Sequence, residues 1–248
     1  MSYIKTSAQI AHIKVACRIA AEILKQLVTA VKPGITTLEL DRLAEQLCKE
    51  YKVQPSFKGY LNYPFSICIS INEQVVHGLP GKRELCQGDM VGIDFGTIYR
   101  GYFSDIARTV PVGQASKEAS RLIDVTRMAL RKAIDQVKPG RTIGDIGHAV
   151  QSYVEAQGMA VVRDLVGHGV GTAIHEPPAI PNYGRKGSGA QLVAGMVLAL
   201  EPMVNLGGAE VKLMNNGWTF QTKDHSLSAH FEDTVLVTEH GHEVLTVS

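Results

Sequence analysis

Residues 31–36 read VKPGIT and residues 137–142 read VKPGRT, so one short motif occurs twice at well-separated points of the chain. In both copies a helical pattern of apolar residues precedes the Lys-Pro-Gly turn, and another follows it. Proline and glycine are expected to end the first helix, while Thr36 or Thr142 is placed to cap the second. The motif therefore predicts two similar helical pairs.

The similarity continues into the strands. Residues 90–91 and 196–197 both read Met-Val at the same separation as the two turns, and each begins an apolar strand. The first of these strands ends in Asp94 and the second in Glu201. A second strand then follows in each half, and both of these strands again open on a carboxylate, Asp105 and Glu232. This order favours duplication of one ancestral unit.

Helical pairs that alternate with hairpins favour an α+β fold with antiparallel sheet over a doubly wound dinucleotide fold. The first helix is expected over residues 7–28, where apolar side chains recur at three- and four-residue steps. Asn216-Gly217 lies between two strand-like segments and predicts a hairpin with a type I′ turn. We expect one domain over residues 1–248, with a central antiparallel sheet flanked by helices and pseudo-twofold halves of about 1–113 and 114–248.

The composition is that of a globular protein, with 248 residues of which 45% are hydrophobic and 20% charged. The net charge of +1 gives no electrostatic reason to expect nucleic acid or a membrane surface as partner. The first residues do not read as a signal peptide, and the longest apolar run, residues 192–200, is too short to span a bilayer. The four cysteines lack CxxC spacing and are expected to be reduced thiols, so we expect a cytoplasmic protein.

Five candidate metal ligands lie in stretches that otherwise read as buried strand or glycine-rich turn: Asp94, Asp105, His168, Glu201 and Glu232. Carboxylates are seldom buried unless a cation meets them. Two carboxylates about 4 Å apart repel by roughly 4 kcal/mol at an effective dielectric near 20, so four in one pocket would not all ionise without cations. Each residue alone reads as a solvated strand end, but the set predicts a pair of divalent ions and a two-metal hydrolase. Mn²⁺, Fe²⁺, Co²⁺ and Zn²⁺ all accept carboxylate oxygens, and one imidazole shifts the preference toward the transition metals.

Besides His168, three further histidines are candidates for chemistry: His77, His175 and His230. His168 lies in a GHGVG segment, which we expect to be flexible and to let the backbone approach a metal. His175 follows shortly and suits the other side of one cleft, and His77 repeats the His-Gly step in the first half. His230 stands two residues before Glu232 and is placed to share its strand face. The remaining histidines are interpreted as structural or surface residues, apart from His225, which the sequence leaves open.

Seven short motifs run through nearly the whole chain: SINEQVVHG (70–78), DFG (94–96), SD (104–105), GHGVG (167–171), HEPP (175–178), EPM (201–203) and LSAHFE (227–232). Together these motifs resemble those of the type I methionine aminopeptidases, a metallopeptidase family with the so-called pita-bread fold. The resemblance implies that the five ligands bind two divalent ions (Co, Mn, Fe or Zn), with Asp105 and Glu232 bridging them.

The resemblance also implies the reaction, which is removal of the N-terminal methionine from newly made proteins and peptides by attack of activated water on the first peptide bond. In that scheme Glu201 also shuttles the proton, His175 donates a hydrogen bond to the developing oxyanion, and His77 holds the amide nitrogen of the second residue. The implied methionine pocket is lined by Tyr60, Tyr63, Cys68, Ile174 and Trp218. Without the resemblance, the two tyrosines read equally well as loop aromatics. Trp218 is either a pocket wall, which is the favoured interpretation, or a core residue.

Two residues depart from the pattern of the family. Phe57 stands where the family often has cysteine and would add a wall to the methionine pocket, while His230 stands where glutamine is common. Fine substrate preference and metal tuning are therefore the properties in doubt.

Two other functions stay open at this point. One is an Xaa-Pro dipeptidase or aminopeptidase on the same fold, against which the absence of a large N-terminal domain argues. The other is a non-catalytic binding relative, which would be expected to have lost metal ligands. The expected partners are the N-termini of nascent polypeptides, with the ribosome as a candidate contact. We expect a monomer that binds neither nucleic acid nor membrane.

Overall fold

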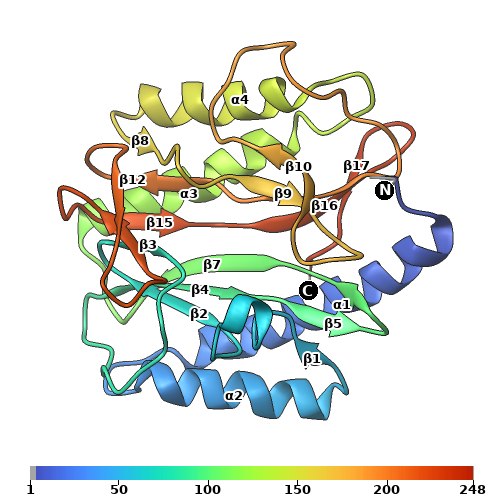
Figure 1. The fold of residues 1–248 in the computed structure, drawn as a ribbon. Coiled ribbons are helices and arrows are strands. Elements are labelled where there is room, and N and C mark those ends of the chain that lie inside the picture. The colour runs from blue at the N-terminus through green and yellow to red at the C-terminus, as the bar shows by residue number, and fades with distance from the viewer. Residues whose placement is uncertain (1–3, 248) are drawn as a thin grey trace.

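The computed structural model describes residues 4–247. Within them the α-helices form two pairs, α1 (Ser7–Ala30) with α2 (Thr37–Glu50), and α3 (Lys117–Ile134) with α4 (Ile143–Ala156). Figure 1 shows the blue pair on one side of the molecule and the green-yellow pair on the other, with strands between them. The expected first helix is confirmed and extends slightly further, to Ala30.

Both threonines after the repeated turns cap their helices as the sequence predicts. The Thr36 hydroxyl accepts a hydrogen bond from the backbone N–H of Glu39 at 3.2 Å, and the Glu39 carboxylate accepts one from the Thr36 N–H at 2.8 Å. Thr142 and Asp145 repeat the arrangement at 3.3 and 2.9 Å. Each reciprocal cap satisfies two backbone donors that would otherwise lack partners, and such a cap stabilises a helix by about 1 kcal/mol.

The strands pair in antiparallel fashion throughout the described residues. A short 3-10 helix, Tyr60–Asn62, lies between the first two of them. In chain order the strands are β1 (Gln54–Pro55), β2 (Cys68–Ile71), β3 (Gln74–Val76), β4 (Met90–Phe95), β5 (Thr97–Tyr99), β6 (Tyr102–Phe103), β7 (Ile106–Pro111), β8 (Ala160–Val161), β9 (Gly167–Gly169), β10 (Glu176–Ile180), β11 (Val197–Leu200), β12 (Met203–Asn205), β13 (Val211–Leu213), β14 (Phe220–Thr222), β15 (Ser228–His230), β16 (Asp233–Val237) and β17 (His242–Val244).

The central sheet is built from two halves that meet at one bridge. The first half has the order β2-β4-β7 and the second the order β10-β9-β11-β16-β17. They join where the Glu232 N–H donates to the Ala107 carbonyl at 2.9 Å and the Ala107 N–H donates back at 3.3 Å. This bridge brings the start of β7 beside the start of β16, so a segment from the middle of the chain meets one from its C-terminal part at the centre (Figure 1).

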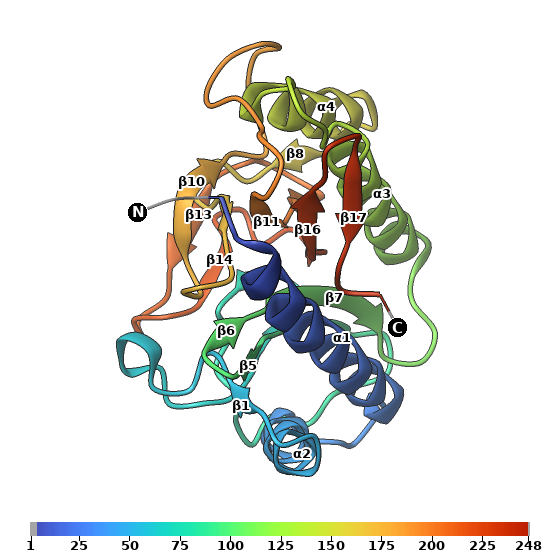
Figure 2. The ribbon, with the colours of Figure 1, turned by 90° about the vertical axis from the view of Figure 1, so that its right-hand side faces the viewer.

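Each helical pair packs an apolar core onto its own half of the sheet, and the start of α1 also reaches the other half, where Ile13 belongs to one cluster with Val197 and Leu236. Leu24 of α1 and Ile93 of β4 belong to one buried cluster, whereas Leu122 of α3 and Leu198 of β11 belong to another. The turned view in Figure 2 shows α1 crossing one half and α3 lying beside the other. The described residues contain no helix with both the length and the apolar character that crossing a bilayer requires.

The predicted hairpin is confirmed as β13–β14, but the prediction of a type I′ turn is wrong. Such a turn needs a positive φ at both central residues. Gly217 has φ +77°, whereas Asn216 is not among the residues with positive φ. Instead the Gly217 N–H donates to the Met214 carbonyl at 3.0 Å, and the Asn216 side-chain oxygen accepts from the N–H groups of Trp218 and Thr219 at 3.0 Å each. Asn216 therefore stabilises a longer loop through its side chain.

Gly78 allows the segment after β3 to approach β2 closely. Its carbonyl accepts from the Ile69 N–H at 2.9 Å, and an added Cβ would lie 1.9 Å from the Ile69 carbonyl oxygen. We expect Gly78→Ala to lower the free energy of unfolding by at least ~2 kcal/mol, because backbone on both sides must move apart. Urea unfolding measures this change. Gly81→Ala, where a Cβ would meet nothing within 4 Å, is the control, and equal stability of the two variants would contradict the close approach.

Candidate metal centre and active site

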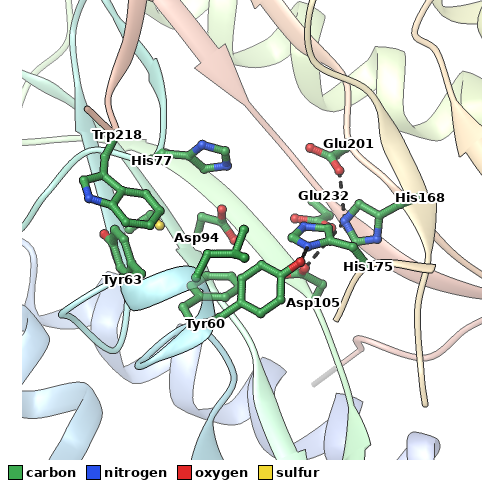
Figure 3. Close-up of a pocket in the computed structure, with 13 residues that line it drawn as sticks. Tyr60, Tyr63, His77, Asp94, Asp105, His168, His175, Glu201, Trp218 and Glu232 are labelled. Carbon is green, nitrogen blue, oxygen red and sulfur yellow. Dashed lines mark hydrogen bonds and ion pairs between the residues drawn. The ribbon is translucent and has the colours of Figure 1, made fainter. Parts of the chain in front are cut away.

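The four candidate carboxylates lie at the ends of strands that meet at the central bridge. Asp94 is near the end of β4, Asp105 directly precedes β7, Glu201 directly follows β11 and Glu232 directly precedes β16. His168 lies on β9, opposite Ala199 of β11. The structure thus brings all five predicted ligands into one cavity, as Figure 3 shows.

The ligand atoms are close enough for metal ions to lie between them. The His168 Nε2 atom lies 3.3 Å from a Glu201 oxygen and 3.8 Å from an Asp105 oxygen. Asp105, His168 and Glu232 each offer an atom within 4.8 Å of the others. Oxygen and nitrogen donors in this number and spacing suit Mn²⁺, Fe²⁺, Co²⁺ or Zn²⁺.

The carboxylates have strongly perturbed proton affinities in the absence of a cation. Desolvation of its carboxyl group raises the pKa of Asp94 to about 7. Desolvation, together with repulsion from neighbouring carboxylates, raises the pKa of Asp105, Glu201 and Glu232 well above the usual range. Each of these groups is therefore costly to ionise unless a cation compensates its charge.

Unpartnered oxygen atoms test whether a metal fits this site. Among residues 4–247, Asp94 Oδ1, Asp105 Oδ1 and Glu232 Oε1 are buried and have no hydrogen-bond partner. Buried acceptors are almost always satisfied, and a cation would satisfy these three at once. The donor set of the described residues therefore fits divalent metal ions.

His168 is prepared for ligation by a backbone hydrogen bond. Its Nδ1–H donates to the Gly169 carbonyl at 3.0 Å, which leaves the lone pair of Nε2 directed at the carboxylates. Desolvation lowers the pKa of His168 to about 3, so the ring is neutral and able to bind a metal.

The glycines around His168 have a role other than flexibility. A Cβ at Gly167 would lie 2.5 Å from the Ala199 carbonyl oxygen, and one at Gly169 would lie 2.4 Å from that of Pro177. Gly167–Gly169 is a regular strand held between β10 and β11. These glycines therefore allow the two neighbouring strands to approach this one closely, and the expected flexibility of the segment stays a prediction.

His175 and His77 lie at different parts of the cavity. The His175 ring lies 4.4 Å from that of His168, and its Nδ1 atom is 2.9 Å from the Tyr60 hydroxyl. His77 follows β3 in a left-handed conformation with φ +58°, and its ring lies 6.0 Å from that of Phe220. Desolvation lowers the pKa of His77 to about 4, so its ring is neutral. Backbone strain of this kind often occurs at functional sites.

Aromatic residues form the apolar end of a cavity of about 170 Å³. The Tyr63 ring meets Trp218 edge to face at 5.0 Å, and Trp218 lines the cavity. Figure 3 shows this apolar end beside the carboxylates. The lining consists of Phe57, Tyr60, Leu61, Tyr63, Cys68, His77, Asp94, Asp105, His168, His175, Glu201, Trp218 and Glu232.

Two residues differ from the expected lining. Ile174 is only 2% exposed and lies within the apolar cluster of Phe57, Tyr63 and Cys68, so it supports the wall from behind. Leu61 lines the cavity although the sequence did not point to it, and it is 71% exposed. Its left-handed φ of +48° sets its direction, and no periodic pattern in the sequence indicates that conformation.

His230 lies against two of the carboxylates. It is 4% exposed, and its Nε2 atom lies 3.6 Å from Glu201 Oε2 and 4.0 Å from Glu232 Oε2, with no hydrogen-bond partner among the described residues. The other Glu201 oxygen faces His168. Glu201 therefore lies between two imidazoles, and desolvation lowers the pKa of His230 to about 3.

Comparison with known proteins gives consistent similarities. The sequence model described as metallopeptidase family M24 matches residues 11–239. A methionine aminopeptidase of Clostridium acetobutylicum is 49% identical over 248 residues, covering 100% of this chain and 99% of that protein. The crystal structure of a methionine aminopeptidase from Thermotoga maritima superposes with a TM-score of 0.98 at 44% identity, with both chains covered completely.

A more distant solved structure bears on the Xaa-Pro alternative. The prolidase from Pyrococcus furiosus has a TM-score of 0.80 at 27% identity. It matches 99% of this chain but only 66% of its own, so the shared part is one region of a longer protein.

Proposed function

Because the chain belongs to metallopeptidase family M24 and is a methionine aminopeptidase of the type I, bacterial-like kind, we propose that five of its side chains hold two divalent metal ions. The residues that would hold them are Asp94, Asp105, His168, Glu201 and Glu232, which all line one cavity. The observation that carries this proposal is the set of three buried carboxylate oxygens without a partner in residues 4–247. Such ions would be Co, Mn, Fe or Zn, and when bound they lower the pKa of water and polarise a carbonyl.

The protein removes N-terminal methionine, and three of its side chains have proposed roles in that hydrolysis. Glu201 moves the proton of the attacking water, since its carboxylate faces the centre of the ligand set. His175 donates a hydrogen bond from its Nε2–H to the oxygen that becomes negative, while its Nδ1 accepts from the Tyr60 hydroxyl. His77, at another part of the cavity, holds the amide of the second residue.

The apolar end of the cavity is the proposed methionine pocket. Tyr60, Tyr63, Cys68 and Trp218 line it, and Ile174 supports it from behind. Phe57 adds an aromatic wall, against which a thioether packs favourably.

A panel of metals and substrates under anaerobic conditions tests the proposal. Met-Ala-Ser should lose methionine with at least one of Mn²⁺, Co²⁺, Fe²⁺ or Zn²⁺, while Xaa-Pro dipeptides stay intact. Faster cleavage of the Xaa-Pro bond would favour the prolidase-like alternative. No turnover with any of the four metals would favour a non-catalytic relative.

Metal binding should stabilise the folded protein. We expect Mn²⁺ to raise the melting temperature of chelator-treated protein, because ions that bind only the folded state add about 2.7 kcal/mol at a hundredfold excess over Kd. Differential scanning calorimetry measures the rise. Asp124→Asn, which changes an exposed carboxylate on α3, should respond like the parent protein. A melting temperature that no divalent metal changes would contradict the metal centre.

The chain acts on the N-termini of newly made proteins, and we propose that it meets them in the cytoplasm as a monomer, close to the ribosome. A net charge of +1 supports the absence of a nucleic-acid or membrane partner of its own. We also propose that the single domain arose by duplication of halves of about 1–113 and 114–248. The matching caps at Thr36 and Thr142 support this history.

A further inference from the structure

A buried lysine from the start of the chain contacts the loop that carries His175. Lys5 is 6% exposed, its Nζ atom contacts the Glu176 carboxylate, and it lies 3.5 Å from the Thr172 hydroxyl. Residues 170–175 connect β9 to β10, and Glu176 is the first residue of β10. Figure 2 shows the chain entering α1 beside β10. A cation from the N-terminal segment therefore lies at the base of this loop.

Glu176 closes the loop with its other oxygen. That oxygen accepts hydrogen bonds from the Thr172 N–H at 2.5 Å, the Thr172 hydroxyl at 2.6 Å and the Ala173 N–H at 2.8 Å. Desolvation favours protonation of Glu176, but the hydrogen bonds from Lys5, Thr172 and Ala173 prevail and lower its pKa. The carboxylate stays ionised and ties the end of the loop to its middle, at Thr172 and Ala173.

Lys5 is itself fixed by the backbone around it. Its N–H donates to the Gly195 carbonyl at 2.8 Å, and Ile4 forms a β-bridge with Met196. Thr6 then caps α1 through the Gln9 N–H. The ammonium group is thus presented to Glu176 from a rigid base, and removing it leaves a largely buried carboxylate without its cation, which is costly.

From this network we infer that Lys5 is a positioning residue for His175. The inference rests on the proposed role of His175 as the donor to the developing oxyanion. His175 directly precedes Glu176, so a shift of the Glu176 backbone moves the imidazole. Misplacement of a catalytic group by about 1 Å can cost a hundredfold in rate, whereas it need not change ground-state binding.

Comparison of two lysine variants tests the inference. Lys5→Met keeps the length of the side chain and removes its charge. It should lower kcat on the order of tenfold, with KM and the Kd for Mn²⁺ within about twofold of the parent. Lys14→Met is the matched control, because Lys14 also lies in the N-terminal region and pairs with a glutamate, Glu243, at 2.6 Å on a more exposed surface. An unchanged kcat in Lys5→Met would overturn the inference.

A double-mutant cycle separates positioning from general destabilisation. If Lys5 acts through His175, Lys5→Met should cause no further loss of kcat in a His175→Ala background. Losses that multiply would overturn the inference. Full activity of His175→Ala would instead refute the proposed role of His175, so the two failures are distinguishable.

Two further measurements test the inference even if Lys5→Met folds poorly. Lys5→Ala supplied with methylammonium should regain kcat, because the small cation can occupy the space beside Glu176. Thr172→Val, which removes one donor to Glu176 and no charge, should lower kcat less than Lys5→Met and leave KM unchanged. No recovery with methylammonium, together with an unaffected Thr172→Val enzyme, would overturn the inference.

Discussion

Replacing Asp105 with asparagine is expected to lower kcat for methionine release by more than about a thousandfold, because one proposed ligand of the metal ions is lost. Asp105 is only 3% exposed, and its oxygens lie next to His168 and Asp94, with one of them unpartnered in the described chain. Metal content per protein, measured by atomic emission after dialysis, should fall together with kcat. Retention of both would contradict the proposed centre.

The same substitution should have opposite effects on stability with and without metal. In metal-free protein, desolvation and then repulsion from neighbouring carboxylates raise the pKa of Asp105, which costs stability at any pH above the unfolded-state pKa. Asparagine removes that cost, so at neutral pH the melting temperature should rise above that of the parent. With Mn²⁺ present it removes a ligand, so the gain from the metal should shrink. Asp89→Asn is the control, since Asp89 is also buried but accepts from the Cys86 N–H and the Asn72 amide. That variant should lose stability in both conditions.

The part of the site that rests on regular structure could be predicted from sequence. A repeated turn followed by a capping threonine predicts where helices begin, and both caps are confirmed at Thr36 and Thr142. Carboxylates at the ends of apolar strands predict convergence, because strand ends of neighbouring antiparallel strands share an edge of the sheet. Local sequence patterns are sufficient for these features. They correctly predict that Asp94 and Glu201 lie at the ends of strands β4 and β11.

The remaining features depend on contacts that no local pattern encodes. Lys5 and Glu176 are 171 positions apart, and neither belongs to a periodic or charged run that would pair them. The contact between Tyr60 and His175 likewise joins two loops, 115 positions apart. Asn216 shows the same limit at short range, since its side chain satisfies two backbone donors and thereby selects a longer loop than the Asn-Gly pair suggests.

Replacing His175 with alanine is expected to lower kcat by about a hundredfold or more, the usual effect of removing one donor to a developing oxyanion. KM should change little, because the hydrogen bond strengthens only as charge forms on the oxygen. Mn²⁺ affinity should be unaltered, since His175 lies beside the ligand His168 without belonging to the ligand set. Steady-state kinetics with Met-Ala-Ser and calorimetric metal titration provide these three quantities.

A surface histidine supplies the comparison for this result. His148 on α4 contacts the Ser152 hydroxyl at 3.3 Å, away from the cavity, so His148→Ala should leave all three quantities unchanged. A loss of metal in His175→Ala would show that this imidazole is a ligand and not a donor to substrate. A rise in KM with kcat preserved would instead assign it to ground-state binding. The expected pattern, a fall in kcat alone, is the one that follows from a neutral imidazole whose Nδ1 faces Tyr60 and whose Nε2 is left for the substrate.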